Sequence, residues 1–260
     1  MNSSGEVTLS RHGPIAEILI NRPEKLNALT VEMLEALYAI ILELDVDTVI
    51  QVVILHTAGD RAFCVGADIN AWAEYRPLDM WRSWVKRGHR VFDALAGLRQ
   101  PVIAVVQGPA LGGGFELAMA ADLRVVDLKA RFGLPETVIA TCPGWSGSQR
   151  LAKLINPSLI KELVFTGRTI NAQRALAMGL VNEVAEIGEA LLLARAMANE
   201  VVSRAPVSVQ LSKQMIDAGS GSNTAMIIEA MAGGLAAFTE DAKEGVLAFR
   251  ERRQPEFKGE

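Results

Sequence analysis

The sequence predicts an α/β fold, in which strands and helices alternate, followed by a region built mainly of helices. Two observations lead to this prediction. Short β-branched runs, bounded by glycine, proline or charged residues, alternate with segments of helical periodicity through the first two thirds of the chain. From about Asn171 onward nearly every segment has the periodicity of a helix. Strands that are separated by helices are typical of α/β proteins.

The first predicted elements are a strand, a helix and a second strand. Ile15–Ile20 and Val49–Leu55 are short, apolar and rich in β-branched residues, which favours strands. Between them, the hydroxyl of Thr30 can cap the N-terminus of a helix. That helix would bury apolar residues that recur with the helical period: Met33, Leu34, Leu37, Ile40, Ile41 and Leu44.

A long helix and a third strand follow. The helix is predicted over Leu78–Leu98 and ends before Pro101, because the residue that precedes a proline disfavours helical geometry. Val102–Val106 is the third strand. We divide the chain into an α/β core with the functional site, residues 1–199, and a helical C-terminal region, residues 200–260.

The composition excludes several classes of protein. Of the 260 residues, 50% are hydrophobic and 22% are charged, which is unlike a disordered or fibrous chain. The formal charge of −4 gives no electrostatic reason to expect nucleic acid as a partner. No apolar run reaches the roughly 20 residues of a membrane span, and the polar N-terminus lacks the apolar core of a secretory signal. We expect a cytoplasmic protein with no membrane partner.

Several common sites can also be excluded. Cys64 and Cys142 are too few for a disulfide framework or a cysteine zinc site, and we expect two half-buried thiols. The segment 144–148, GWSGS, lacks the second glycine of a nucleophile elbow. The three histidines are scattered and make poor zinc ligands or triad members: His12, His56 and His89.

Two glycine-bearing segments each follow a predicted strand. They are residues 63–69, FCVGADI, and residues 108–118, GPALGGGFELA. Glycine lets a strand turn sharply with its backbone amides exposed, and a helical pattern follows each turn. One amide from each segment could therefore converge on a single oxygen and stabilise it as an anion. The spacing also allows two tight turns that merely bring helices close.

Two glutamates lie near these segments. Glu116 is two residues beyond the last glycine of the second segment, within an apolar stretch, and Glu136 lies twenty residues further on. Buried carboxyls have raised pKa values and can act as acids and bases near neutrality. A glutamate at a helix start can equally serve as a partner of the helix dipole. The pattern alone leaves both interpretations open.

With these segments in view, the sequence resembles the crotonase superfamily, the enoyl-CoA hydratases and isomerases. The resemblance extends from residues 21–28, NRPEKLNA, to residues 239–249, TEDAKEGVLAF. It is strongest over residues 108–116 and 143–151, the latter reading PGWSGSQRL. The resemblance implies a crotonase-type ββα spiral core with a C-terminal helical trimerisation region.

The resemblance also implies a role for four residues. Ala67 and Gly113 match the two positions whose backbone N–H groups form an oxyanion hole, where a thioester carbonyl would become an enolate. Glu116 and Glu136 match the two glutamates that hold a water molecule in hydratases of the family. Hydration needs one carboxylate that takes a proton from water and one carboxylic acid that supplies a proton to carbon.

Further positions match the family's substrate-binding segments. Phe249 and Arg252 match C-terminal positions that reach the coenzyme A of a neighbouring subunit. Trp145, which stands where many relatives have a small residue, would line the acyl pocket or pack into the core. The remaining coenzyme A positions lie in a segment near residue 26 and in or directly after the two glycine segments: Lys25, Leu26, Ala28, Ala67, Asp68, Ile69, Asn70 and Gly113. Asn70-Ala71 replaces a common Lys-Glu pair, and three tryptophans lie in a segment that varies with substrate: Trp72, Trp81 and Trp84.

The function implied is that of a lyase of fatty acid metabolism, an enoyl-CoA hydratase. It would add water reversibly to a 2-trans-enoyl-CoA and give a 3-hydroxyacyl-CoA. No metal or redox cofactor would be needed, coenzyme A being part of the substrate, and the protein would be a homotrimer or a dimer of trimers. One alternative is an enoyl-CoA isomerase or another CoA lyase of the same fold. The other is a non-catalytic homologue that binds coenzyme A or RNA. The presence of both glutamates favours the hydratase.

Overall fold

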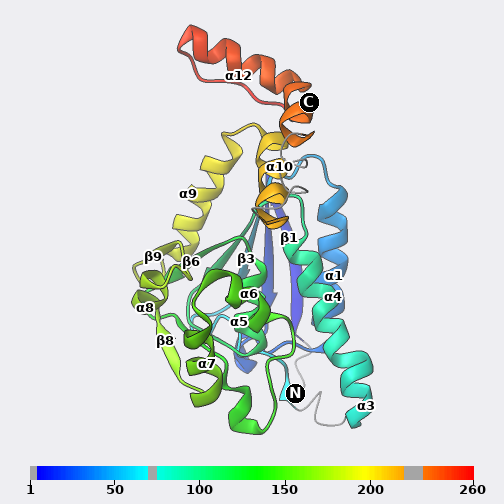
Figure 1. Ribbon diagram of the computed structural model, residues 1–260, viewed down its shortest axis with the longest axis vertical. Coiled ribbons are helices and arrows are strands. Elements are labelled where there is room, and N and C mark those ends of the chain that lie inside the picture. Colours follow the sequence, from blue (N-terminus) through cyan, green and yellow to red (C-terminus); the bar gives the residue numbers. More distant parts are fainter. Residues whose placement is uncertain (1–4, 70–74, 220–230) are drawn as a thin grey trace.

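The computed structural model describes residues 5–69, 75–219 and 231–260, and its core is built on two β-sheets (Figure 1). In the larger sheet β1 and β2 are antiparallel and the other neighbours are parallel. Its order is β1 (Glu6–His12), β2 (Ile15–Asn21), β3 (Val52–Thr57), β4 (Val102–Val106), β6 (Leu123–Asp127) and β9 (Glu183–Ala185). The smaller sheet joins β5 (Pro109–Leu111), β7 (Arg131–Gly133) and β8 (Thr169–Asn171).

Helices surround the sheets. The first half of the chain contributes α1 (Val31–Val46), α3 (Pro77–Asp79), a π-helical turn (Met80–Val85), α4 (Lys86–Ala96) and α5 (Gly113–Ala120). The second half contributes α6 (Gly147–Leu154), α7 (Pro157–Thr166), α8 (Ala172–Ala177), α9 (Ala190–Val202), α10 (Pro206–Asp217) and α12 (Glu240–Glu251). The described residues also form two 3₁₀ turns, at Pro23–Lys25 and Pro135–Ile139. This mixed α/β architecture confirms the predicted fold class.

Helix α1 forms as its sequence predicts. The Thr30 side chain accepts a hydrogen bond from the Met33 N–H at 3.2 Å and so caps the helix. Five of the six residues predicted to face the core are buried, and Ile40 is half-buried at the margin of the stripe. The predicted helix over residues 78–98 is also present, as α3, the π turn and α4 in succession.

Most strands missed by the sequence analysis are short or lie at an edge; the exception is β6, a largely buried strand of five residues inside the larger sheet. β1 is an edge strand of half-exposed and exposed residues, so it lacks the apolar run that marks a buried strand. β8 and β9 have three residues each, which is too few for a period to appear. Of these two, β9 interrupts the region after Asn171, which the sequence predicts to be helical almost throughout.

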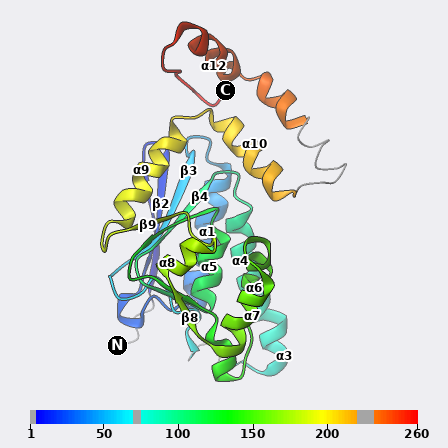
Figure 2. The same ribbon diagram turned by 60° about the vertical axis from the view of Figure 1, so that its left-hand side comes forward.

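Side chains of the larger sheet alternate between two separate apolar clusters. Val53 and Leu55 face the cluster that includes α1, α4 and α5, whereas Val52 and Ile54 face the cluster beneath α9. Figures 1 and 2 show α9 on one side of the sheet and α1 and α4 on the other. Because side chains of a strand point alternately to the two faces, a sheet covered on both faces reads as a continuous apolar run.

Helix α9 is fixed to the sheet by an ion pair within its apolar cluster. Arg195 donates two hydrogen bonds to the Glu17 carboxylate, at 2.7 and 2.8 Å, and Glu17 is only 4% exposed. These bonds lower the pKa of Glu17 below its ordinary value, although burial opposes the shift. His56 lies 3.6 Å from the same carboxylate, and burial lowers the pKa of its imidazole. We therefore interpret His56 as a structural residue beside the Glu17 carboxylate.

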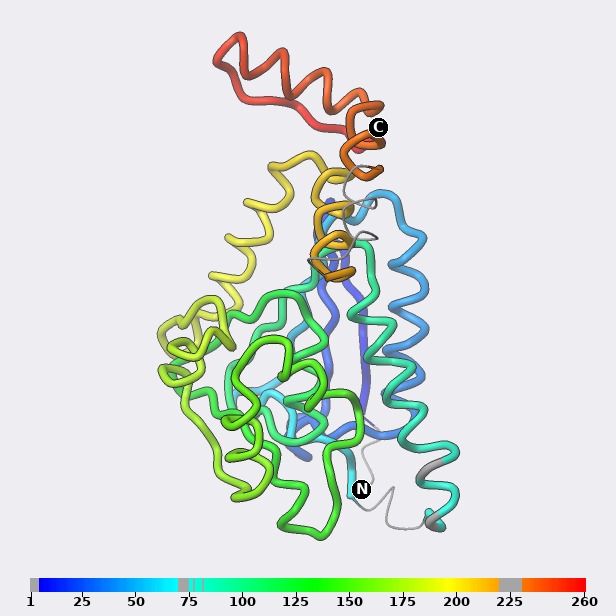
Figure 3. The backbone as a smooth tube through the Cα atoms, viewed as in Figure 1, coloured from blue at the N-terminus to red at the C-terminus, as the bar shows by residue number. Residues whose placement is uncertain are grey.

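The C-terminal segment extends away from the sheets (Figure 3). Helix α10 is tied to the core, because Lys213 Nζ donates to the Gln100 carbonyl at 3.1 Å and to Asp122 at 2.8 Å. Helix α12 lies beyond it, and the division of the chain near residue 200 stays a proposal. No helix in the described part of the chain is both long and apolar enough to cross a membrane.

We expect the change Arg195→Met to lower the free energy of unfolding at pH 7 by about 2 kcal/mol, because it leaves a buried carboxylate without its partner. The depressed pKa of Glu17 stabilises the fold above the ordinary carboxyl range, and this contribution is lost as the pH falls through the folded-state value. The difference between wild type and variant should therefore shrink in acid. Denaturant titrations at pH 7 and pH 4 measure both.

The matched control for this change is Arg174→Met, which removes an arginine from the exposed ion pair with Glu162. Exposed pairs contribute about 1 kcal/mol or less. If the two variants lose the same free energy of unfolding, the buried pair of Glu17 and Arg195 stabilises the fold no more than an exposed ion pair does.

Candidate active site

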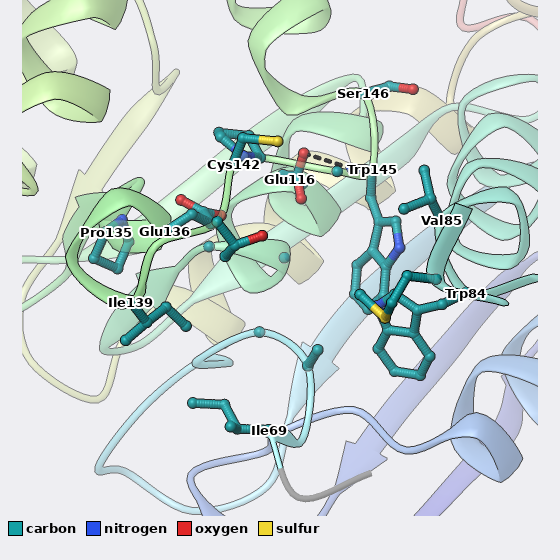
Figure 4. Close-up of a pocket in the computed structure, with 18 of the residues that line it drawn as sticks. Ile69, Trp84, Val85, Glu116, Pro135, Glu136, Ile139, Cys142, Trp145 and Ser146 are labelled. Carbon is teal, nitrogen blue, oxygen red and sulfur yellow. Dashed lines mark hydrogen bonds between the residues drawn. The ribbon is translucent and has the colours of Figure 1, made fainter. Parts of the chain in front are cut away.

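A cavity of about 440 Å³ opens between the π turn, α5, the second 3₁₀ turn and the start of α6 (Figure 4). Its lining is mostly apolar, and it contains four of the residues to which the sequence analysis gave a role in catalysis or in the oxyanion hole. These are Ala67, Gly113, Glu116 and Glu136. Residues far apart in sequence therefore meet at one place.

The parallel pairing of β5 and β7 brings the two glutamates together. Leu111 at the end of β5 lies beside Gly133 at the end of β7, and the Gly112 N–H donates to the Gly133 carbonyl at 3.0 Å. The carboxyl ends of parallel strands meet at one edge of a sheet. Helix α5 begins directly after the first strand and the 3₁₀ turn directly after the second, so Glu116 and Glu136 both reach the cavity at this edge.

Glu116 is held by backbone amides at a buried position. Its Oε1 accepts the N–H groups of Trp145 and Gly147, both at 2.8 Å, and the residue is 2% exposed. Burial raises the pKa of this carboxyl, and the amide donors act against that rise because they stabilise the anion. Glu116 is thus a buried carboxyl that the sequence alone could not distinguish from a dipole partner.

Glu136 has a different environment. Burial raises its pKa to about 7, and the negative charge of Glu116 contributes to the same shift. Its Oε2 is buried and has no hydrogen-bond partner within the described residues. Figure 4 shows Glu136 on one side of the cavity and Trp145, Trp84 and Val85 on the other, with Glu116 between them. A carboxyl with a pKa near neutrality and an unused oxygen is suited to donate a proton.

The two glycine segments touch where the oxyanion hole was expected. Gly66 has a φ of +97°, and a Cβ built on it would lie 3.0 Å from the Gly113 nitrogen, so a side chain there would force the segments apart. Neither the Ala67 N–H nor the Gly113 N–H donates a hydrogen bond to any group in residues 5–69, 75–219 or 231–260. Both donors therefore remain available to a ligand in the cavity.

The segment around Asn27 braces the first glycine segment from behind. Arg22 is buried and pairs with Asp68 at 2.8 Å. The Leu29 N–H donates to the Gly66 carbonyl at 2.8 Å, and Leu26 accepts from the Val65 N–H at 3.2 Å. Four predicted coenzyme A positions belong to this brace or lie next to it, outside the cavity lining: Lys25, Leu26, Ala28 and Asp68.

The other predicted substrate positions fall in three places. Ile69 and Trp145 line the cavity. Phe249 and Arg252 lie on α12 and at its C-terminus, away from the cavity of their own chain (Figure 1). Asn70, together with the neighbouring Ala71 and Trp72, lies outside the described residues.

The indole of Trp145 belongs to the wall of the cavity and to the core at once. It is 3% exposed and contacts the rings of Trp84 and Phe92, with centroid separations of 5.4 and 5.3 Å. Trp84 is 4% exposed and also lines the cavity. Of the two interpretations of Trp145, core packing accounts for most of its surface.

His89 and Cys142 are among the lining residues to which the sequence analysis gave no role. His89 was set aside as an isolated histidine, yet it lines the cavity and its Nδ1 lies 3.5 Å from Ser146 Oγ. Its place is explained by the structure, in which His89 follows the lining residue Val85 by four residues and so shares its helix face. Cys142, expected to be half-buried, is exposed and lines the cavity, whereas Cys64 is fully buried and its thiol pKa is raised to about 12.

Within the described residues, no three His, Cys, Asp or Glu side chains are placed to hold a metal ion. The cavity instead combines two carboxyls of different environment with two unused backbone donors. This arrangement defines an enzyme of acid–base chemistry whose substrate carries a carbonyl group.

The comparisons with known proteins narrow this class. Residues 10–260 match the enoyl-CoA hydratase/isomerase family. A short-chain-enoyl-CoA hydratase of Clostridium acetobutylicum is 42% identical over 96% of each chain, and a crotonyl-CoA hydratase of Syntrophomonas wolfei is 36% identical over 96% of this chain and 97% of its own. The crystal structure of an enoyl-CoA hydratase from Bacillus anthracis has a TM-score of 0.93 at 36% identity and covers 98% of this chain and 99% of its own.

The chain therefore belongs to the enoyl-CoA hydratase/isomerase family, and the resemblance that the sequence suggested is confirmed. The relatives also confirm the predicted enzyme class, a hydro-lyase with enoyl-CoA hydratase activity. The roles of individual residues rest on the geometry described above.

Proposed function

We propose that this enzyme adds water reversibly to a short 2-trans-enoyl-CoA, with Glu116 and Glu136 as its acid–base pair. The observation that carries the proposal is the pair itself: two carboxyls of different environment in one cavity, opposite two unused N–H donors. The names of the relatives, a short-chain-enoyl-CoA hydratase and a crotonyl-CoA hydratase, support the choice of substrate.

The oxyanion hole supplies the electrophilic part of the mechanism. The N–H groups of Ala67 and Gly113 would donate to the thioester oxygen of the substrate. When water adds to C3, the electrons of the double bond move onto this oxygen, and the two donors stabilise the enolate. The anion then collapses as C2 takes up a proton. No metal or redox cofactor takes part in this sequence, and coenzyme A enters only as part of the substrate.

The environments of the two glutamates divide the proton transfers between them. Glu116 accepts two N–H donors, which favour its anionic form, so we assign it as the base that takes a proton from the attacking water. Glu136, with its pKa near 7 and its unpartnered Oε2, is the acid that protonates C2. Glu136 loses one proton to C2, and Glu116 gains one from water. Transfer of a proton from Glu116 to Glu136 therefore restores the starting protonation states.

A double-bond isomerase of the same family is the nearest alternative. Moving a double bond requires one group that takes a proton and returns it at another carbon, so one working carboxyl is enough. The second carboxyl with its raised pKa favours hydration.

Assembly and location complete the proposal. Several large apolar side chains in and next to α12 are exposed in the single chain, and contact with other copies would bury them: Met231, Leu235, Phe238, Val246, Leu247 and Phe249. We propose a homotrimer or a dimer of trimers, in which Phe249 and Arg252 reach the coenzyme A of a neighbouring subunit. Lys25–Ala28 and residues 67–70 would line the coenzyme A channel of their own chain. The expected setting is cytoplasmic fatty acid metabolism.

The first prediction of the proposed function concerns the glutamate pair. Glu116→Gln and Glu136→Gln keep the size and hydrogen-bonding capacity of each side chain but remove its acid–base function. Each change should lower the kcat for hydration of crotonyl-CoA by about 100-fold or more. Near wild-type hydration by Glu136→Gln would refute its assignment as the acid.

The second prediction concerns pH. Because Glu136 must be protonated to act as the acid, kcat/KM should fall about tenfold per pH unit above about pH 7. Hydration consumes no net proton, so its equilibrium does not depend on pH and dehydration must fall in parallel. Rates in both directions over pH 5 to 9 provide the test. A flat profile above pH 7 would contradict the assignment.

The third prediction concerns assembly. Light scattering should report three or six subunits, and Phe249→Asp should weaken the assembly because it places a charge on an apolar contact. A wild-type protein that remains a stable monomer at micromolar concentration would contradict the proposed trimer.

A further inference from the structure

The indole of Trp145 fills the space between two helices that would otherwise be separate walls of the cavity. Its five-membered ring lies against Gly88 of α4, where an added Cβ would be 2.0 Å from Nε1. Its six-membered ring lies against Gly113 of α5, where an added Cβ would be 2.6 Å from Cζ3. Real Cβ atoms do not approach other atoms so closely, so both positions require glycine while the indole is in place.

The backbone of the same residue holds a catalytic group. The Trp145 N–H donates to Glu116 at 2.8 Å, and Gly147 donates to the same oxygen. Between them, Ser146 has a φ of +70°, which lies in the left-handed region that residues with a side chain seldom adopt. Arg150 anchors the loop through the Trp145 carbonyl at 3.2 Å.

We propose that Trp145 is a positioning residue, whose indole, seated between Gly88 and Gly113, sets the loop that orients Glu116 and the backbone that presents the Gly113 N–H. This inference rests on the proposed function. One side chain thus fixes the base and one oxyanion donor relative to each other. Misplacement of a reacting group by about 1 Å can cost on the order of 100-fold in rate.

The contacts of the ring explain why it can fix a position. Trp84 and Phe92 contact the indole, and the two glycines contact its opposite edges. A ring enclosed in this way cannot shift without moving α4, α5 or the loop that carries its own backbone. Ordinary core packing would leave the catalytic geometry intact when a neighbour changes, so the two roles can be separated by experiment.

The decisive variant is Gly88→Ala, because Gly88 does not line the cavity and the three atoms nearest to an added Cβ all belong to the indole. Alanine favours a helix over glycine, so α4 itself should not be weakened. The displaced indole should lower kcat for crotonyl-CoA about tenfold or more, with KM changed less than about threefold. As the amide donors leave Glu116, the acid limb of the pH profile should move to higher pH.

Two further variants make the test specific. Trp145→Phe retains an aromatic ring, although a smaller one, so we expect it to lower kcat less than Gly88→Ala does. The double variant should have the kcat of Gly88→Ala alone. Arg174→Met, the exposed control variant introduced above, is the control here too, because Arg174 lies outside the cavity lining, and its kinetics should equal those of wild type.

The inference is overturned if Gly88→Ala keeps the wild-type kcat and acid limb, even with a lower melting temperature. It is also overturned if the losses of the two single variants multiply in the double variant, since independent sites give additive free energies. Glu116→Gln separates this failure from that of the proposed function. If that variant is inactive while Gly88→Ala is normal, Glu116 keeps its role and only the positioning role of Trp145 is lost.

Discussion

One carboxylate oxygen, Glu116 Oε1, joins the parts of the molecule that make the site. It projects from α5, which follows β5, and it accepts hydrogen bonds from the loop that precedes α6. Two charge-assisted bonds to backbone amides outweigh what the same groups would contribute if neutral. They fix the carboxyl, and no lysine or arginine of the described residues forms an ion pair with it. Such a cation would have lowered its pKa further and made it a weaker base.

The two faces of the larger sheet have different roles: one faces the candidate active site, and the other has a structural role. One face carries the glycine segments and the aromatic wall of the cavity. The other carries α9 and the ion pair of Glu17 with Arg195, where a buried carboxyl is neutralised and held. The contrast between Glu17 and Glu136 is instructive: both are glutamates in apolar surroundings, and the presence or absence of an arginine decides whether the pKa falls or rises.

Local patterns in the sequence were enough to predict the elements with a clear period and a cap, such as α1 behind Thr30 and the buried strand β4. They also drew attention to both glycine segments and to the two glutamates, but the roles of the glutamates came from the resemblance to the family. Local patterns could not reveal the edge strand β1 or the three-residue strands, among them β5 and β7, which lead to Glu116 and Glu136. The surroundings of Trp145 were equally hidden, since Gly88 and Phe92 approach it only through tertiary packing.

The last twenty residues bond largely to one another. Asp241 accepts the N–H groups of Lys258 and Gly259, at 2.6 and 2.8 Å, and its own N–H donates to the Glu260 carbonyl. Arg253 closes a second link to Glu244. Helix α12 and the tail that returns along it thus form a closed loop with its own hydrogen-bond network. We expect such a loop to open as one cooperative unit, so that its amide hydrogens exchange together and differently from those of the sheets.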